Sequence, residues 1–308
     1  MDSNSEGAMK RIYHIVVISV LALSLQACEG NVPVAEILGQ SCSAVTEVLW
    51  DTSFVLSNGV LYSELTLKTS GDAMQQIHLL KVESRKGNML KMVLPENSTD
   101  ITGGWRKQTL TEMSDVLAGD GYEVIAMTNA DFWNTAEPIN PRGPVHCGGY
   151  TVSPSWDYSD RVPQQALSFV GICQDGTPVI DEKAGYDSVA SELEECCGSG
   201  VIMLADGEVT EDKYNLRDPR TAIGYGLDGT FWLLVADGRG FSGAAGLTYG
   251  EMGEIFKALG CEAAVNLDGG GSAQMLIRDR ATGKHYIANS PCDGRERPVI
   301  SGWAIIKK

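Results

Sequence analysis

The sequence is short of positive charge. Its 308 residues include 24 Lys and Arg against 40 Asp and Glu, which gives a formal net charge of −16. An excess of negative charge of this size repels nucleic acid and anionic lipid surfaces. We therefore expect no nucleic-acid partner, and a phosphate-bearing ligand would have to be held by a few local cationic or amide groups.

Histidine is also scarce, with four residues, and the eight cysteines show none of the spacings typical of a zinc site. Cys196 and Cys197 are adjacent, and only His146 stands beside a cysteine. We expect no metal and no cofactor; calcium, which acidic loops could hold, is the one alternative. The seven cysteines beyond Cys28 are an odd number, so we expect small buried side chains or one or two disulfides.

The N-terminal apolar run is shorter than the roughly 20 residues that a membrane-spanning helix needs. It covers residues 12–25, follows Lys10 and Arg11, and ends just before Ala27-Cys28. A basic start, a short apolar stretch and a cysteine after a small residue are typical of a bacterial lipoprotein signal. We expect residues 1–28 to be a signal peptide with its lipobox cysteine. Acylated Cys28 would then anchor the protein to a membrane of the bacterial cell envelope, on the periplasmic or outer-membrane surface.

The rest of the chain contains no repeat and no low-complexity tract. Residues 29–58 have little periodicity and are expected to be a tether, with at most a short element near residues 44–50, whereas residues 59–308 suit one domain. A capping box at Thr109 and Glu112 predicts a helix that ends at Gly119. Alternating or apolar runs predict strands at residues 60–69, 75–82, 89–94, 122–128, 166–173 and 201–204.

The clearest structural unit lies near the C-terminus. An apolar strand is predicted at residues 231–236 and another at 263–267, and between them Thr248 and Glu251 cap a helix. Such units normally place their two strands in parallel as neighbours, about 4.8 Å apart. Asp237 and Asp268 would then emerge at the same end of the sheet, within reach of one small ligand. The alternative that another strand lies between them stays open. The fold class expected is α+β (mixed α/β): a twisted mixed β-sheet core flanked by helices, with this unit carrying the site.

Two strand ends carry unusual polar clusters. The run from Asn266 to Ser272 combines an amide, a carboxylate, three glycines and a hydroxyl, and Asn129 with Asp131 follows the strand at 122–128. Three successive glycines lose much chain entropy on folding, so we expect a positive φ or a close approach of the backbone to a ligand. The alternative is a tight turn in which Asp268 bonds only to its own backbone.

Two arginines stand in motifs beside these clusters, Arg220 within Pro219–Gly224 and Arg239 directly after Asp237-Gly238. A guanidinium suits two oxygens of one phosphate, although Arg220 could instead pair with Asp218 on the surface. Residues 238–243 also match GxGxxG. We reject a dinucleotide site because that motif opens its helix within the glycines, whereas this helix is capped ten residues after the first glycine.

Together these motifs resemble the phosphodiester glycosidase family over about residues 60–308. The segments that carry the resemblance are Asn129–Trp133, Pro219–Gly224, Asp237–Arg239, Gly246–Glu251, Asn266–Ser272 and Pro291–Val299. The resemblance implies release of N-acetylglucosamine from a phosphodiester, with exposure of a phosphomonoester. Asp131 stands where the family usually has glycine, Trp133 replaces phenylalanine, and Ala273-Gln274 stands where Ser-Thr is common.

The function expected is therefore hydrolysis of a sugar-1-phosphodiester, with a phosphorylated glycan as the substrate. Asp268 would act as nucleophile or base and Asp237 as the supporting carboxylate. Asn129 and Asp131 complete the expected catalytic group, and the residues expected to hold the substrate are Arg220, Thr221, Arg239, Asn266, Gly269, Gly270, Gly271 and Ser272. Two alternatives stay open: a surface lipoprotein that binds glycans without turnover, and a metal-dependent phosphodiesterase, for which the expected His and Asp clusters are lacking.

Overall fold

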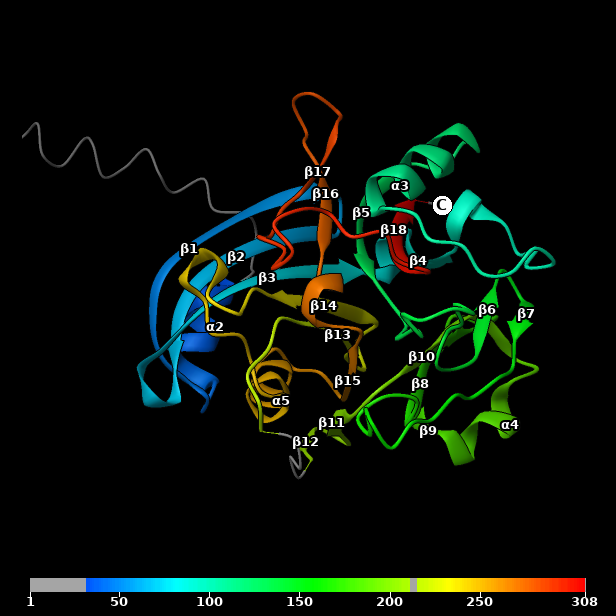
Figure 1. Ribbon diagram of the computed structural model, residues 1–308. Coiled ribbons are helices and arrows are strands. Elements are labelled where there is room, and N and C mark those ends of the chain that lie inside the picture. Colours follow the sequence, from blue (N-terminus) through cyan, green and yellow to red (C-terminus); the bar gives the residue numbers. More distant parts are fainter. Residues whose placement is uncertain (1–31, 211–214, 308) are drawn as a thin grey trace, which may run out of the picture. The chain divides into compact units, whose positions relative to one another are not determined.

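The strands of this protein form one large antiparallel sheet and two smaller ones. The computed structural model describes residues 32–210 and 215–307 (Figure 1), so the expected signal peptide and Cys28 lie outside the described part. The eight-stranded sheet has the order β1 (Val45–Ser57), β2 (Val60–Thr69), β3 (Ala73–Glu83), β14 (Thr230–Ala236), β13 (Arg220–Tyr225), β15 (Ala263–Leu267), β11 (Ile202–Ala205) and β12 (Glu208–Val209).

The two five-stranded sheets pack beside this one. The first has the order β7 (Tyr150–Ser153), β6 (Val145–Cys147), β10 (Leu193–Ser199), β8 (Ser168–Cys173) and β9 (Pro178–Glu182). The second has the order β17 (His285–Ile287), β16 (Met275–Arg278), β5 (Val124–Asn129), β18 (Gly302–Lys307) and β4 (Asn88–Val93). Hydrogen-bonded strand neighbours within residues 32–210 and 215–307 all run antiparallel.

The helices cover the outer faces of these sheets. They are α2 (Val34–Ser41), α3 (Leu110–Gly119), α4 (Tyr186–Val189) and α5 (Tyr249–Ala258). The predicted capping boxes of α3 and α5 are both present, with Thr248 accepting from the Glu251 amide and Glu251 accepting from the Thr248 amide. Antiparallel sheets with separate helices on their faces confirm the expected α+β class.

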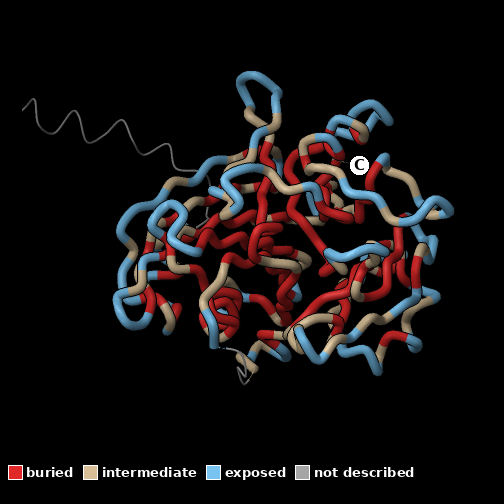
Figure 2. The backbone as a smooth tube through the Cα atoms, viewed as in Figure 1, coloured by how far each residue is buried: buried red, intermediate tan, exposed pale blue. Residues whose placement is uncertain are grey.

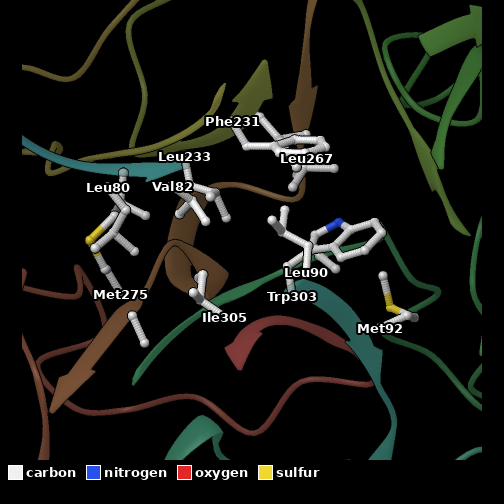
Figure 3. Packing of buried hydrophobic residues seen from close by; sticks show 14 of the residues in the cluster. Leu80, Val82, Leu90, Met92, Phe231, Leu233, Leu267, Met275, Trp303 and Ile305 are labelled. Atoms are coloured by element: carbon white, nitrogen blue, oxygen red, sulfur yellow. The ribbon is translucent and has the colours of Figure 1, made fainter. Parts of the chain in front are cut away.

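Strict alternation along β14 separates two hydrophobic cores. Phe231, Leu233 and Val235 face the small sheets, whereas Trp232 and Leu234 face α2 and α5. Figure 3 shows the first core, in which side chains of β3, β14 and β15 meet those of β4, β16 and β18. The buried central strands are red in Figure 2. Because side chains in a strand alternate between faces, this pattern also decides which way each strand-end residue points.

The tether expected at residues 29–58 is wrong for most of its length. Residues 34–41 form α2 and residues 45–57 form β1, which pairs with β2 along its whole length. Val34 and Leu38 of α2 are buried against the large sheet. The sequence signal was weak because β1 is an edge strand whose exposed positions include the apolar Trp50 and Phe54.

The prediction that the strands of the C-terminal unit are neighbours is also wrong. β14 and β15 point in the same direction, but β13 lies between them and pairs antiparallel with both. Their ends are therefore two strand spacings apart, about 10 Å. An intervening strand drawn from earlier in the sequence is a non-local pairing that local periodicity does not reveal.

The cysteines of the described residues are free thiols, and all but Cys292 are buried. This agrees with the expectation of small buried side chains and not with disulfides. None of the helices in the described residues is long and apolar enough to cross a membrane.

Candidate active site

A polar cavity of about 210 Å³ lies where β13 begins and β15 ends. Six of the predicted site residues line it: Arg220, Arg239, Asp268, Gly269, Gly270 and Gly271. The other lining residues are Phe132, Gln164, Gln165, Asp218, Tyr249 and Arg297. The cavity therefore brings together residues that lie far apart in the chain.

Asp268 is a partly exposed residue that lines this cavity. Burial raises its pKa to about 6, even though hydrogen bonds from Ser272 and Trp133 and the charge of Arg297 act in the opposite direction. A carboxyl group with this pKa is mostly ionised at pH 7 and is still able to take up a proton. Such a value suits a group that transfers protons or attacks carbon near neutral pH.

The three glycines after Asp268 are required by close contacts. A Cβ at Gly269 would lie 2.6 Å from the Pro219 carbonyl, and one at Gly271 would overlap the guanidinium of Arg297. Gly270 has a φ of 60° and donates its N–H to the Pro219 carbonyl at 2.8 Å. The expected positive φ is confirmed at Gly270, and the close contacts of Gly269 and Gly271 are to other residues of the protein. The Gly270 amide, however, already donates to the Pro219 carbonyl. It is therefore not the phosphate donor that we expected.

Arg220 is a buried cation on the α5 side of the cavity, with 9% of its surface exposed. Its guanidinium stacks on the ring of Tyr249 at 4.3 Å and donates to the Tyr249 hydroxyl at 2.9 Å. Its other bonds go to the carbonyls of Leu216 and Leu247. All of these acceptors are neutral, and within residues 32–210 and 215–307 no carboxylate forms an ion pair with Arg220.

The other two arginines of the cavity are each paired with a carboxylate. Arg239 binds Asp218 through two bonds of 2.8 and 3.1 Å, so the surface partner considered for Arg220 belongs to Arg239 instead. Arg297 binds Asp293 at 2.7 Å and reaches the Ser272 hydroxyl at 3.4 Å. Among the residues that the structure describes, Arg220 is thus the cavity arginine without a carboxylate partner.

Asp237 does not line the cavity with Asp268, contrary to expectation. It follows Val235 on the face that turns toward the small sheets, and its amide continues the ladder to the Gln76 carbonyl at 3.0 Å. Its carboxylate is 1% exposed and accepts from the Asn289 side chain, the Ser290 amide and the Ser242 hydroxyl. These bonds tie two loops together, which is a structural role.

Three of the predicted polar residues stabilise the ends of strands and do not face the cavity: Asn129, Thr221 and Asn266. Asn129 donates to the Asp268 carbonyl and accepts from the Thr221 hydroxyl. Asn266 accepts from the Val201 amide at 2.6 Å. Each is at most 1% exposed, so they support the backbone of the site and do not contact a ligand.

Asp131 is buried behind the cavity with 3% of its surface exposed. Its Oδ2 accepts from the Gly143 amide at 3.2 Å, while its Oδ1 lies close to Gly198 without a hydrogen-bond partner. Loss of hydration, together with repulsion from Asp268, raises the pKa of Asp131 well above its ordinary value. Because Asp131 lies behind the cavity, its carboxylate cannot act directly on a substrate there or bind calcium there. In the described part of the chain, no three His, Cys, Asp or Glu side chains gather so that they could hold a metal ion.

Several lining residues were missed from the sequence. Arg297 lies in the segment 291–299 that carried the family resemblance, so a signal existed for it. Gln164 and Gln165 come from an irregular segment without periodicity, and only the tertiary structure places them at the cavity. Tyr249, the first residue of α5, also lies in a segment that carried the resemblance, Gly246–Glu251.

A family model described as phosphodiester glycosidase matches residues 122–306. This chain belongs to the phosphodiester glycosidase family. The matched region runs from β5 to β18 and includes every residue that lines the cavity. The expected family membership is confirmed.

A curated relative and several solved structures resemble this family member. An uncharacterized protein derived from the SPbeta prophage of Bacillus subtilis (strain 168), YomE, is 40% identical over 91 residues, which cover 30% of this chain and 13% of the relative. This chain thus matches only a small part of that longer protein.

Among solved structures, the catalytic domain of zebrafish N-acetylglucosamine-1-phosphodiester alpha-N-acetylglucosaminidase, auto-inhibited by its pro-peptide, has a TM-score of 0.63 with 16% identity over 87% of both chains. A putative exported protein of Burkholderia pseudomallei K96243 has a TM-score of 0.60 with 13% identity over 91% of this chain and 100% of the other. A hypothetical protein from Synechocystis has a TM-score of 0.59 with 14% identity, over 84% of this chain and 64% of the other. At these identities the likeness shows a common fold.

Proposed function

We propose that this protein hydrolyses sugar-1-phosphodiesters. The bond between the anomeric carbon and the phosphate oxygen breaks, water supplies a hydroxyl to the sugar, and the phosphate leaves as a phosphomonoester. The observation that carries the proposal is that Asp268 and Arg220 line one cavity, one as an accessible carboxylate and the other as a buried cation without an acidic partner among the described residues.

The chemistry needs little beyond these two groups. Positive charge develops at the anomeric carbon as the glycosidic bond breaks, and a carboxylate stabilises or attacks that centre. Asp268 takes this role as nucleophile or base. Phosphate is already a good leaving group, so a second, acidic carboxyl group is not required. The guanidinium of Arg220 offsets the negative charge on the departing phosphate.

The first substrate to test is a phosphodiester of N-acetylglucosamine 1-phosphate. The zebrafish structure with the same fold carries that substrate in its name. The cavity wall is also almost entirely polar, with arginine, glutamine and aspartate side chains, which suits a sugar and a phosphate more than an apolar ligand.

The test is incubation of the purified protein with the methyl phosphodiester of N-acetylglucosamine 1-phosphate in ¹⁸O-labelled water. Release of N-acetylglucosamine together with methyl phosphate that carries no label supports the proposal, because cleavage at the anomeric carbon leaves every phosphate oxygen unchanged. Label in the phosphate, with activity lost on chelation, would instead indicate a metal-dependent phosphodiesterase. Binding of the ester without any release, in protein whose fold is intact, would indicate a glycan-binding protein. Asp268→Asn serves as the matched inactive variant.

We further propose that the protein acts at the cell envelope, held by a lipid on Cys28. Support comes from the sequence alone, through the basic start, the short apolar run and the cysteine after Ala27. Expression of the full chain in a bacterium with labelled palmitate tests this proposal. Label should enter the wild-type protein and be absent from Cys28→Ala, and equal labelling of both would refute lipidation at this residue.

A further inference from the structure

The side chain of Gln274 is fully buried and forms hydrogen bonds with the main chain of Arg297. Its Oε1 accepts from the Arg297 amide at 2.6 Å, and its Nε2 donates to the Arg297 carbonyl at 3.0 Å. Its own amide donates to Oδ1 of Asn129 at 3.1 Å, and Asn129 in turn holds the Asp268 carbonyl. One side chain therefore joins the loop after Asp268 to the segment that carries Arg297.

The two hydrogen bonds from the Gln274 side chain take the place of the backbone pairing that a neighbouring strand would give Arg297. Residues 288–301 form no strand, so regular backbone pairing does not fix Arg297. A primary amide offers one donor and one acceptor in the same plane, which matches the N–H and C=O of a single residue. The glutamine thus supplies the two hydrogen bonds that a neighbouring strand would otherwise supply.

The position of Arg297 matters because its guanidinium lies directly over Gly271. Nη1 reaches the Ser272 hydroxyl at 3.4 Å, and Nε donates to Asp293 at 2.7 Å. Ser272 is also hydrogen-bonded to Asp268, and the positive charge of Arg297 favours the ionised form of that carboxyl group. A shift of the Arg297 main chain would carry the guanidinium away from both.

We propose that Gln274 is a positioning residue for the Asp268 site: by pairing with the main chain of Arg297, it holds the guanidinium where it stabilises the Asp268 carboxylate. The catalytic consequence rests on the proposed function. The electrostatic consequence does not.

The experiment is a ¹³C NMR titration of the Asp268 side-chain carboxyl carbon, assigned by its loss in Asp268→Asn. Gln274→Met keeps the size of the side chain and removes both hydrogen bonds to Arg297. We expect it to raise the pKa of Asp268 by about one unit, as loss of a nearby opposite charge does. Arg297→Met should give a rise at least as large. In the Arg297→Met background, Gln274→Met should add nothing, because its effect passes through Arg297.

The matched control is Gln75→Met. Gln75 is also buried, at 1% exposure, and bonds to Thr69 away from the cavity. This control should lower the melting temperature and leave the pKa of Asp268 unchanged. If Gln274→Met does not fold, Gln274→Thr, which is too short to bond both main-chain groups of Arg297, gives the same readout.

An Asp268 pKa equal to that of wild type in a folded Gln274 variant overturns the proposal, and so does an unchanged value in Arg297→Met. If the protein hydrolyses the phosphodiester, the acidic limb of its kcat profile should move upward with the measured pKa. If it hydrolyses nothing, the proposed function fails while the titration still decides the role of Gln274.

Discussion

The side-chain amide of Asn129 donates to the main-chain carbonyl of Asp268 at 2.6 Å. Its oxygen accepts from the Thr221 hydroxyl at 2.7 Å and from the Gln274 amide at 3.1 Å. These contacts join the ends of β5, β13 and β15 through one buried residue, so the backbone of the proposed catalytic carboxylate is fixed from a different sheet.

Replacement of this amide should weaken both the fold and the site. Asn129→Leu leaves the Asp268 carbonyl without its donor and the Gln274 amide without its acceptor, and each such loss costs about 1–3 kcal/mol. We expect the free energy of unfolding in urea to fall by at least about 2 kcal/mol, and kcat to fall more than KM rises. Unchanged unfolding would show that these contacts do not hold the strand ends.

The two strand-end aspartates should behave differently when each is changed to asparagine. Asp268→Asn should lower kcat by about 10² to 10⁴, because the group that transfers a proton or attacks carbon is lost. Asp237→Asn should keep kcat within about tenfold and instead lower the free energy of unfolding, since the Asp237 carboxylate does not line the cavity, accepts from Asn289, Ser290 and Ser242, and lies 3.8 Å from Nε2 of His78. Equal loss of kcat in both folded variants would contradict this division of roles.

The raised pKa of Asp268 predicts a dependence of stability on pH. The folded protein holds this proton with a pKa of about 6, whereas an unfolded chain releases it near the ordinary value of about 3.9. The stabilisation from this group is therefore fully present below about pH 4 and is lost as the pH rises toward 6. Asp268→Asn should be more stable than wild type at pH 8, by about 1–2 kcal/mol, and should show no such gain at pH 4. Urea unfolding at the two pH values measures the difference, and a gain of equal size at both would refute the assignment.

The two motif arginines offer a matched pair for substrate binding. Arg220 is buried and, in the described part of the chain, has only neutral partners, whereas the Arg239 side chain is 52% exposed and already paired with Asp218. Loss of a hydrogen bond to a charged group costs about 1.5–3 kcal/mol, so Arg220→Gln should weaken binding of the phosphodiester by about 10- to 100-fold. Arg239→Gln should change binding by less than about fivefold. Calorimetry with the ester and the inactive Asp268→Asn background measures both. A larger effect at Arg239 would move the anion site to the outer rim of the cavity.

Local elements of this protein followed from local sequence. The hairpin of β2 and β3, the capping boxes at Thr109 and Thr248, and the buried strands before Asp237 and Asp268 all lie close to the predicted positions. The positive φ of Gly270 was likewise expected from the glycine run. These features depend on interactions between residues only a few positions apart, and such interactions are visible in periodicity and capping patterns.

The tertiary structure decided which of these residues meet. Insertion of β13 between β14 and β15 moved the ends of the two strands apart, and alternation along β14 turned Asp237 toward the small sheets. The tertiary structure also placed Arg297 and Gln165, which come from segments without regular structure, in the same cavity as Asp268. By itself, then, the sequence determined the strand ends and the chemistry they carry. Which residues meet at each strand end was decided only by burial of both faces of the large sheet. The free energy gained from this burial is shared among residues far apart in the chain, so local sequence does not reveal it.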